Sequence, residues 1–305
     1  MKIQTTILLL ICIILSGCAN TNINSQTTHI IEFNDALNRT VTLSKYDRVG
    51  IASGSLAECW MLAGGEVCAV TSDAVTEKKL DLPNDCMNLG SLQTPSLEAI
   101  LSADLDFLIL MSSLSNHIQL AETLDKADIA YAYFDIENFH DYCELMKIFT
   151  RITGHDELYY TYASSLQPKI QTLIEDYKRE DSPTVLILRT SSSNVKVLDS
   201  TFMLGGMLQE FGCINIADIE NSLLTELSIE AIVAVDPDYI FISCMGELDE
   251  GQAKLESSLT SNPIWHTLNA VQNGRVFFLE KTLFHQKPNA RWGESYEILG
   301  KMLSQ

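Results

Sequence analysis

Carboxylates recur at matching positions in two stretches of the chain that follow one template, residues 96–109 (SLEAILSADLDFLI) and residues 228–241 (SIEAIVAVDPDYIF). Each stretch holds one glutamate, Glu98 or Glu230, and two aspartates just before an apolar run. Paired carboxylates can perform acid–base catalysis, but aspartates at this place are more typical of a turn into a buried strand. A glutamate in the first turn of a helix is favoured by the helix dipole by about 0.3–1 kcal/mol. Helix stability therefore explains either glutamate alone, whereas a partner with two-fold symmetry would explain why both halves carry one.

A second group of candidate residues follows the ends of predicted strands. Short apolar runs that end in small polar residues, such as residues 49–52 and 185–188, predict strands of open α/β sheets. Ligands bind to such sheets beyond the carboxyl ends of the strands. We therefore expect ligand contacts from Ser53, Ser55, Asp73, Ser113, Arg189, Ser191, Met245 and Lys281. Three candidates lie elsewhere: Trp60 is on the helix after the first strand, and His285 and Arg291 are in the loop before the last helix.

Three of these residues have a competing interpretation. Arg189 directly follows an apolar strand, so its guanidinium would face the cleft and suit a carboxylate, a phosphate or a catecholate oxygen; the alternative is a salt bridge at the edge of a lobe. Trp60 is either an aromatic wall of the site or a core side chain. His285 lies in a polar and aromatic loop, where it would contact ligand, or the iron of a haem, or simply be solvated.

No pattern in the chain indicates an enzyme. There is no Gly-x-Ser-x-Gly, no Walker loop and no His-Glu-x-x-His. The six histidines are scattered singly, so no zinc or manganese cluster is visible, although distant residues could converge in the fold. We expect no catalytic residue, no metal site and no intrinsic cofactor.

The start of the chain predicts export. One lysine precedes an apolar run, and Leu-Ser-Gly-Cys at residues 15–18 is similar to a bacterial lipobox. We interpret residues 1–17 as a signal peptide and residues 18–28 as a lipidated Cys18 with a flexible polar tether. An uncleaved anchor, or a secretory peptide in which Cys18 is incidental, would be the alternatives.

The chain contains eight cysteines, and none of them form a Cys-x-x-Cys pair. Six of them lie beyond the signal and the lipobox. Outside the cell they could form disulfides, whose connectivity cannot be read from spacing, or they could be buried free thiols.

The elements that must position the candidate residues alternate between strand and helix in both halves of the chain. This alternation predicts an α/β fold with two Rossmann-like lobes, residues 29–138 and 181–305, each built on a parallel sheet. Between them, residues 139–180 show apolar side chains at helical spacing and no strand, which predicts a long helical linker. Pro168 lies inside it and should kink or break the helix.

Composition limits the partners. A net charge of −20 excludes a general nucleic-acid-binding surface, which would have to be basic. The hydrophobic share of 46% allows real cores.

Taken in order, the motifs resemble a known family. The motifs that carry this resemblance are the units around Glu98 and Glu230, Gly-Cys-Ile-Asn-Ile at residues 212–216 and Asn-Gly-Arg-Val-Phe at residues 273–277. Through them the chain resembles the substrate-binding lipoproteins of ABC importers for ferric siderophores, haem and cobalamin. The resemblance covers about residues 34–305. In the first unit Leu105 stands where the family pattern has proline.

This resemblance implies a function. The protein would hold an iron chelate, haem or corrinoid between its lobes, and Glu98 and Glu230 would dock on an ABC permease dimer with its ATPase. It would be an extracytoplasmic monomer, anchored to the membrane only through lipid, and would bind no nucleic acid. The alternatives are a binder of bare zinc or manganese, and a sensory or adhesive lipoprotein of the same fold.

Overall fold

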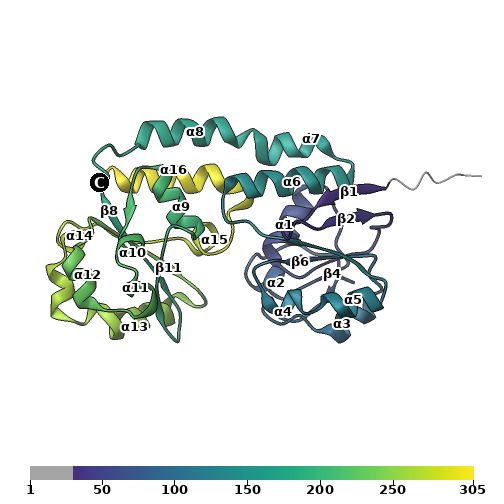
Figure 1. Cartoon of the computed structure of the whole chain (residues 1–305), viewed down its shortest axis with the longest axis horizontal. Helices are drawn as coiled ribbons and strands as arrows, with labels where there is room; N and C mark the ends of the chain where they lie inside the picture. The colour runs from purple at the N-terminus through teal and green to yellow at the C-terminus, as the bar shows by residue number, and fades with distance from the viewer. Residues whose placement is uncertain (1–29) are drawn as a thin grey trace, which may run out of the picture.

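The computed structural model describes residues 30–305. The predicted signal peptide, the lipidation site Cys18 and the tether lie outside the described residues. The described chain forms two α/β lobes bridged along one side by helices (Figure 1). None of the helices in residues 30–305 is long and apolar enough to cross a membrane. The predicted α/β fold with two lobes is confirmed.

The N-terminal lobe contains a five-stranded parallel sheet in the order β5-β4-β3-β6-β7. The chain starts in the middle at β3, winds outward to β5 and then returns past β3 to β6, so the winding direction changes between β3 and β6. Such a switch point leaves a crevice at the carboxyl ends of the strands. The elements are β3 (Val49–Ile51), α1 (Gly54–Leu62), β4 (Ala69–Val70), α2 (Asp73–Thr76), β5 (Met87–Asn88), α3 (Leu97–Ser102), β6 (Phe107–Met111), α4 (Ser115–Ile118), α5 (Ala121–Lys126) and β7 (Ala130–Phe134).

A two-stranded hairpin that the sequence analysis did not predict precedes this sheet. Its strands, β1 (Ile31–Asn34) and β2 (Thr40–Leu43), pair antiparallel. Asp35 begins its turn and accepts from the backbone N–H groups of Leu37 and Arg39, at 3.0 Å each. The hairpin covers the edge of the lobe, because Ala36 N–H donates to the Tyr133 carbonyl in β7 at 2.8 Å.

The C-terminal lobe repeats the plan with one difference. Its strands β10-β8-β11-β12 form the predicted parallel sheet, and β9 adds one strand that pairs antiparallel with β8, which makes this sheet mixed. The elements are β8 (Thr184–Thr190), β9 (Val195–Leu198), α9 (Met203–Glu210), β10 (Ile214–Asn215), α10 (Ile216–Ile219), α11 (Ser222–Thr225), α12 (Ile229–Val235), β11 (Tyr239–Cys244), α13 (Leu248–Leu255), a π-helical turn (Glu256–Thr260), a 3-10 turn (Pro263–Thr267), α14 (Asn269–Gln272), β12 (Val276–Phe278), α15 (Lys281–Phe284), a 3-10 turn (Asn289–Arg291) and α16 (Trp292–Leu303).

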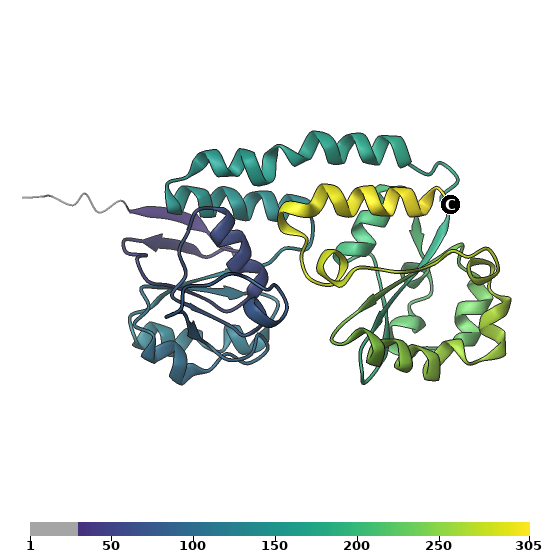
Figure 2. The ribbon, with the colours of Figure 1, turned by 180° about the vertical axis from the view of Figure 1, so that it is seen from behind.

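The connection between the lobes is helical but is not one straight helix. It consists of α6 (Phe139–Thr153), α7 (Asp156–Tyr159), a π-helical turn (Tyr160–Ser164) and α8 (Leu166–Tyr177). Helix α6 ends at Gly154, which adopts the left-handed φ of 78°. The chain then turns back, and α8 lies along α16 (Figure 2).

Pro168 does not break this connection. It falls in the first turn of α8, directly after the π-helical turn, where a missing backbone N–H is tolerated. The helix is therefore not interrupted at Pro168, as the sequence predicted, but before it, by the π-helical turn.

A continuous hydrophobic core couples the linker to the lobes. Phe139 of α6 packs edge-on against Trp292 of α16 with ring centroids 6.0 Å apart, and Tyr296 continues the row to Phe211 of the C-terminal lobe at 5.8 Å. Trp292 is fully buried. Because such interiors are close-packed, the lobes should open only modestly about this seam.

The aspartates of the two repeated units are turn residues, as predicted. Asp104 and Asp236 both adopt a left-handed φ of 51°. Asp106 accepts from the Arg48 N–H at 3.0 Å, and Asp238 accepts from the Thr184 N–H at 2.8 Å. Each carboxylate thus ties the incoming strand to the first central strand of its own lobe.

Candidate ligand-binding site

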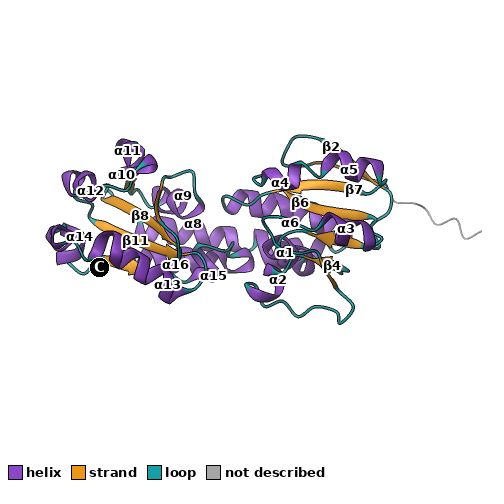
Figure 3. Ribbon diagram, turned by 90° about the horizontal axis from the view of Figure 1, so that it is seen from below, coloured by secondary structure: helices purple, strands orange, loops and turns teal. Residues whose placement is uncertain are grey.

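A cavity of about 520 Å³ lies between the lobes, at the carboxyl ends of both sheets. Seen from below, α1 and α2 of one lobe face α15 of the other (Figure 3). Seven of the residues predicted to contact ligand line the cavity: Ser53, Ser55, Asp73, Arg189, Met245, Lys281 and His285. The switch-point rule thus brings together residues from both halves of the chain.

The N-terminal wall is built where α1 begins. Ser53 caps this helix, accepting from the Leu56 N–H at 3.5 Å. Asp73 of α2 accepts from the Gly54 N–H at 2.7 Å, and its second oxygen is buried with no hydrogen-bond partner in the described structure. Glycine is required at position 54, since a Cβ there would lie 2.7 Å from the Ala74 nitrogen. Asp73 thus holds the start of α1 in place, and it lines the cavity.

The C-terminal wall presents a cation. Arg189 is half-buried in β8, and its guanidinium lies 5.3 Å from the ring centroid of Phe202. Burial lowers the pKa of Arg189, but an arginine stays charged at any physiological pH. Its guanidinium forms no hydrogen bond or ion pair with any residue in the range 30–305, so the edge salt bridge considered above is absent there.

The other lining cations differ from Arg189, because each is paired with a carboxylate of the N-terminal lobe. Lys78 pairs with Glu58 at 2.6 Å, Lys287 pairs with Glu137 at 3.2 Å, and Lys281 pairs with Glu77. Lys281 and Lys287 belong to the C-terminal lobe, so these two pairs cross between the lobes. Within residues 30–305, Arg189 is therefore the one lining cation whose charge is not balanced by a carboxylate.

His285 lies in the cavity among cations. Burial, together with the charges of Arg189 and Lys281, lowers the pKa of His285 to about 4. The imidazole is neutral at pH 7 and can accept a hydrogen bond or bind a metal through nitrogen.

Four predicted ligand residues lie outside this cavity. The prediction for Trp60 is wrong: it is 2% exposed, packs edge-on against Phe149 and donates to the Glu66 carbonyl at 2.9 Å, as a core tryptophan does. Ser191 is buried in a local turn with Asn194. Ser113 and Arg291 also lie outside the lining. The Ser113 N–H donates to the Asp135 carboxylate, and Arg291 forms a bidentate ion pair with Glu294.

Sequence reasoning missed part of the lining and the clasp between the lobes. Asn289 is fully buried in the C-terminal lobe and donates to the Ser55 carbonyl at 3.0 Å and to Glu58 at 2.7 Å in the other lobe. Its left-handed φ of 52° suits asparagine. Only the run of polar residues before α16 signalled this contact. The missed lining residues are Thr76, Glu77, Lys78, Leu92, Gln93, Met111, Gly246, Gln286 and Lys287.

Glu98 and Glu230 occupy equivalent and exposed places. Each lies in the first turn of its helix, α3 or α12, behind a serine N-cap, and these helices lie at opposite ends of the molecule (Figure 1). Neither residue is part of the cavity lining. Nothing in the geometry assigns them a role in holding ligand.

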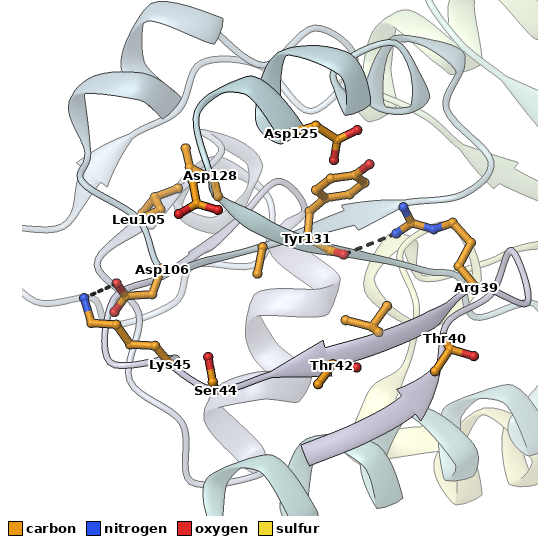
Figure 4. Close-up of a pocket in the computed structure, with 13 residues that line it drawn as sticks. Arg39, Thr40, Thr42, Ser44, Lys45, Leu105, Asp106, Asp125, Asp128 and Tyr131 are labelled. Atoms are coloured by element: carbon orange, nitrogen blue, oxygen red, sulfur yellow. Dashed lines mark hydrogen bonds and ion pairs between the residues drawn. The ribbon is translucent and has the colours of Figure 1, made fainter. Parts of the chain in front are cut away.

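A larger groove of about 800 Å³ lies elsewhere, between the hairpin and the edge strand β7 (Figure 4). Its cations are already neutralised, since Arg39 pairs with Asp35 at 2.7 Å and Lys45 pairs with Asp106. It is lined by the N-terminal lobe alone. The cavity between the lobes is therefore the better candidate for a ligand.

Comparison with known proteins agrees with this architecture. A profile of the periplasmic binding protein family matches residues 51–283. The chain belongs to the periplasmic binding protein family. The solute-binding function implied by the sequence resemblance is thereby confirmed, and members of this family are solute-binding proteins.

Individual relatives extend over most of the chain. The Fe(3+)-citrate-binding protein YfmC of Bacillus subtilis is 23% identical over 89% of this chain and 87% of its own length. Among solved structures, Staphylococcus aureus SirA complexed with staphyloferrin B gives a TM-score of 0.68 at 17% identity, covering 90% of this chain and 97% of that one. S. aureus IsdE complexed with heme gives 0.69 at 16% identity, covering 86% and 100%. At these identities the structures show the shared fold.

Proposed function

We propose that this protein is the extracytoplasmic binding component of an ABC importer and captures an anionic iron chelate, a haem or a corrinoid between its lobes. The observation that carries the proposal is Arg189, a half-buried cation with no carboxylate partner among the described residues, in a protein whose net charge is −20. An acidic protein that keeps one unbalanced cation in its cavity is suited to an anionic group on its ligand.

The names of the relatives support the class of ligand. They include a protein named for Fe(3+)-citrate and structures with staphyloferrin B and with heme. Citrate carries carboxylates, which a guanidinium binds with two parallel hydrogen bonds.

Delivery would use the outer surface. Glu98 and Glu230 would dock on the two subunits of a permease, whose ATPase drives import, while a lipid on Cys18 holds the protein at the membrane. The protein performs no covalent chemistry and acts as a monomer. We retain residues 29–138, 139–180 and 181–305 as the proposed lobes and linker.

The test is a ligand screen with two matched arginine variants. Purified protein is titrated with ferric citrate, ferric catecholate and hydroxamate siderophores, haem, cobalamin, zinc and manganese, and tryptophan fluorescence reports binding. Arg189→Met should weaken binding of the chelate, haem or corrinoid by roughly ten- to a hundred-fold, because a charged hydrogen bond contributes about 1.5–3 kcal/mol. Arg291→Met removes an arginine outside the cavity and should leave affinity unchanged.

Either of two results would contradict the proposal. Binding of zinc or manganese alone would move the protein to the metal-binding class. Equal affinity of the wild type and Arg189→Met for the best ligand would show that the unbalanced cation does not recognise it.

A further inference from the structure

The structure narrows the cysteine pairing that the sequence left open. Four of the six described cysteines are buried, namely Cys59, Cys143, Cys213 and Cys244. The other two, Cys68 and Cys86, are only partly buried and lie just before the neighbouring strands β4 and β5. Strand β5 is an edge of its sheet, so this pair is near the surface.

The backbone brings these two residues next to a paired position on neighbouring strands. Ala69 is paired with Met87 in the parallel register of β4 and β5, and the Met87 N–H donates to the Cys68 carbonyl at 2.8 Å. Cys68 and Cys86 therefore each directly precede a residue of this paired position. Neighbouring strands lie about 4.8 Å apart, and a disulfide needs Cα atoms roughly 4.4–6.8 Å apart.

The surroundings of the two thiols are consistent with this closeness. Burial raises the pKa of both thiols, and the charge of Cys68 further raises that of Cys86. The Cys68 thiol donates to the Val49 carbonyl at 3.4 Å and would have to turn from it to reach Cys86. The backbone pairing, rather than the present direction of the thiol, carries the inference.

We propose that Cys68 and Cys86 form a disulfide in the exported protein. The thiolate of one cysteine attacks a small-molecule disulfide and releases one thiol. The second cysteine then attacks the mixed disulfide and releases the other thiol, so that one protein disulfide and two small thiols result. The inference rests on the extracytoplasmic setting of the proposed function, where disulfides persist.

This bond would anchor one wall of the ligand cavity. Residues 69–85, which it would enclose, carry Asp73, Glu77 and Lys78 of the lining. Few backbone hydrogen bonds hold the later part of this segment, among them Leu80 N–H to the Ala74 carbonyl at 2.9 Å. Since Glu77 and Lys78 also contact the C-terminal lobe, the disulfide would steady the contact between the lobes.

Peptide mapping tests the pairing directly. The full-length protein, extracted from membranes of an exporting host, is exposed to oxidised glutathione, alkylated and digested with trypsin and a glutamate-specific protease without reduction. These cuts separate residues 59–66, 67–77 and 80–98, so Cys59, Cys68 and Cys86 lie on different peptides. We expect a linked pair of residues 67–77 and 80–98 that dithiothreitol separates. Quantitative alkylation of both cysteines, or linkage of either one to another cysteine, would overturn the proposal.

Variants supply a second readout that does not depend on ligand. Reduction should lower the Tm of the wild type by about 5 °C or more, because the bond closes a loop of moderate length. Cys68→Ser with Cys86→Ser should remove this redox-dependent shift, whereas Cys143→Ser should keep it. A shift that persists in the double variant would refute the assignment. Because neither readout involves ligand, loss of ligand binding would count against the proposed function alone.

Discussion

His285 makes the stability of the protein depend on pH in a way that can be calculated. Its pKa is lowered to about 4 by burial and by the neighbouring cations Arg189 and Lys281, whereas histidine in an unfolded chain titrates near 6.5. The folded state binds this proton less well than the unfolded state. The contribution of His285 to the free energy of unfolding is therefore fully present above about pH 6.5 and is lost as pH falls towards 4. The whole shift corresponds to about 3 kcal/mol, of which about 2 kcal/mol is lost by pH 5.

Urea unfolding at pH 7.5 and at pH 5.0 measures this loss. His285→Gln cannot titrate, so its free energy of unfolding should fall by about 2 kcal/mol less between the two pH values than that of the wild type. The pKa values of Glu137 and Glu210 are raised mainly by burial, but both groups titrate in either protein and cancel in the comparison. His140→Gln removes an exposed imidazole and is the matched control.

The same pH dependence in the wild type and in His285→Gln would refute the reasoning. It would mean that the imidazole is hydrated and free of the field of Arg189. Ligand offers a further check, since an anion bound at Arg189 would raise the pKa of His285. By linkage, affinity for the anion should then increase as pH falls from 7 to 5.

Three further predictions concern other parts of the molecule. Asn289→Ala should lower the free energy of unfolding in urea by about 3 kcal/mol, because it removes a neutral and a charged hydrogen bond between the lobes. Asn289→Gly should lower it by about 1 kcal/mol less, since glycine accepts the left-handed φ. Equal losses in the two variants would contradict the backbone argument. Combining Glu98→Ala with Glu230→Ala should abolish uptake in cells and leave ligand affinity intact; unimpaired uptake or lost affinity would sink the docking assignment. Gly65→Ala should destabilise by about 1–3 kcal/mol, because its Cβ would lie 2.1 Å from Trp60 Nε1, and thermal unfolding unchanged from wild type would contradict this contact.

The apolar pattern of the sequence could predict some elements, such as the strand β3 and the last helix, but not others. The last helix occupies residues 292–303, and its apolar face repeats at the helical spacing from which such a helix can be predicted. Strands β1 and β9 have four residues each and pair with a local neighbour. So few residues give no decisive period, and only their partners in the fold determine that they are strands.

Some residues of the candidate site could likewise be predicted from the sequence, and others could not. Ser53 and Arg189 could be placed because both lie at the carboxyl ends of strands at a switch point. Ser191 satisfies the same rule, yet its hydroxyl is held in a turn by Asn194. The ion pair of Glu77 with Lys281 could not be predicted at all, since it depends on how the two lobes meet.

The repeated unit can now be separated into what the fold requires and what it does not. The serine cap and the second aspartate of each unit make hydrogen bonds that begin the helix and tie the strand, as Ser96 with Ala99 and Asp238 with Thr184 show. Glu98 makes no side-chain hydrogen bond or ion pair among residues 30–305, and Glu230 only receives the Ser228 hydroxyl at 3.1 Å. Helix-dipole stabilisation of under 1 kcal/mol would be met as well by an aspartate or by a glutamate elsewhere in the turn. Two exposed carboxylates at equivalent turns of the two lobes are therefore the part of the repeat that the fold does not require, which is why we propose that they dock on a permease.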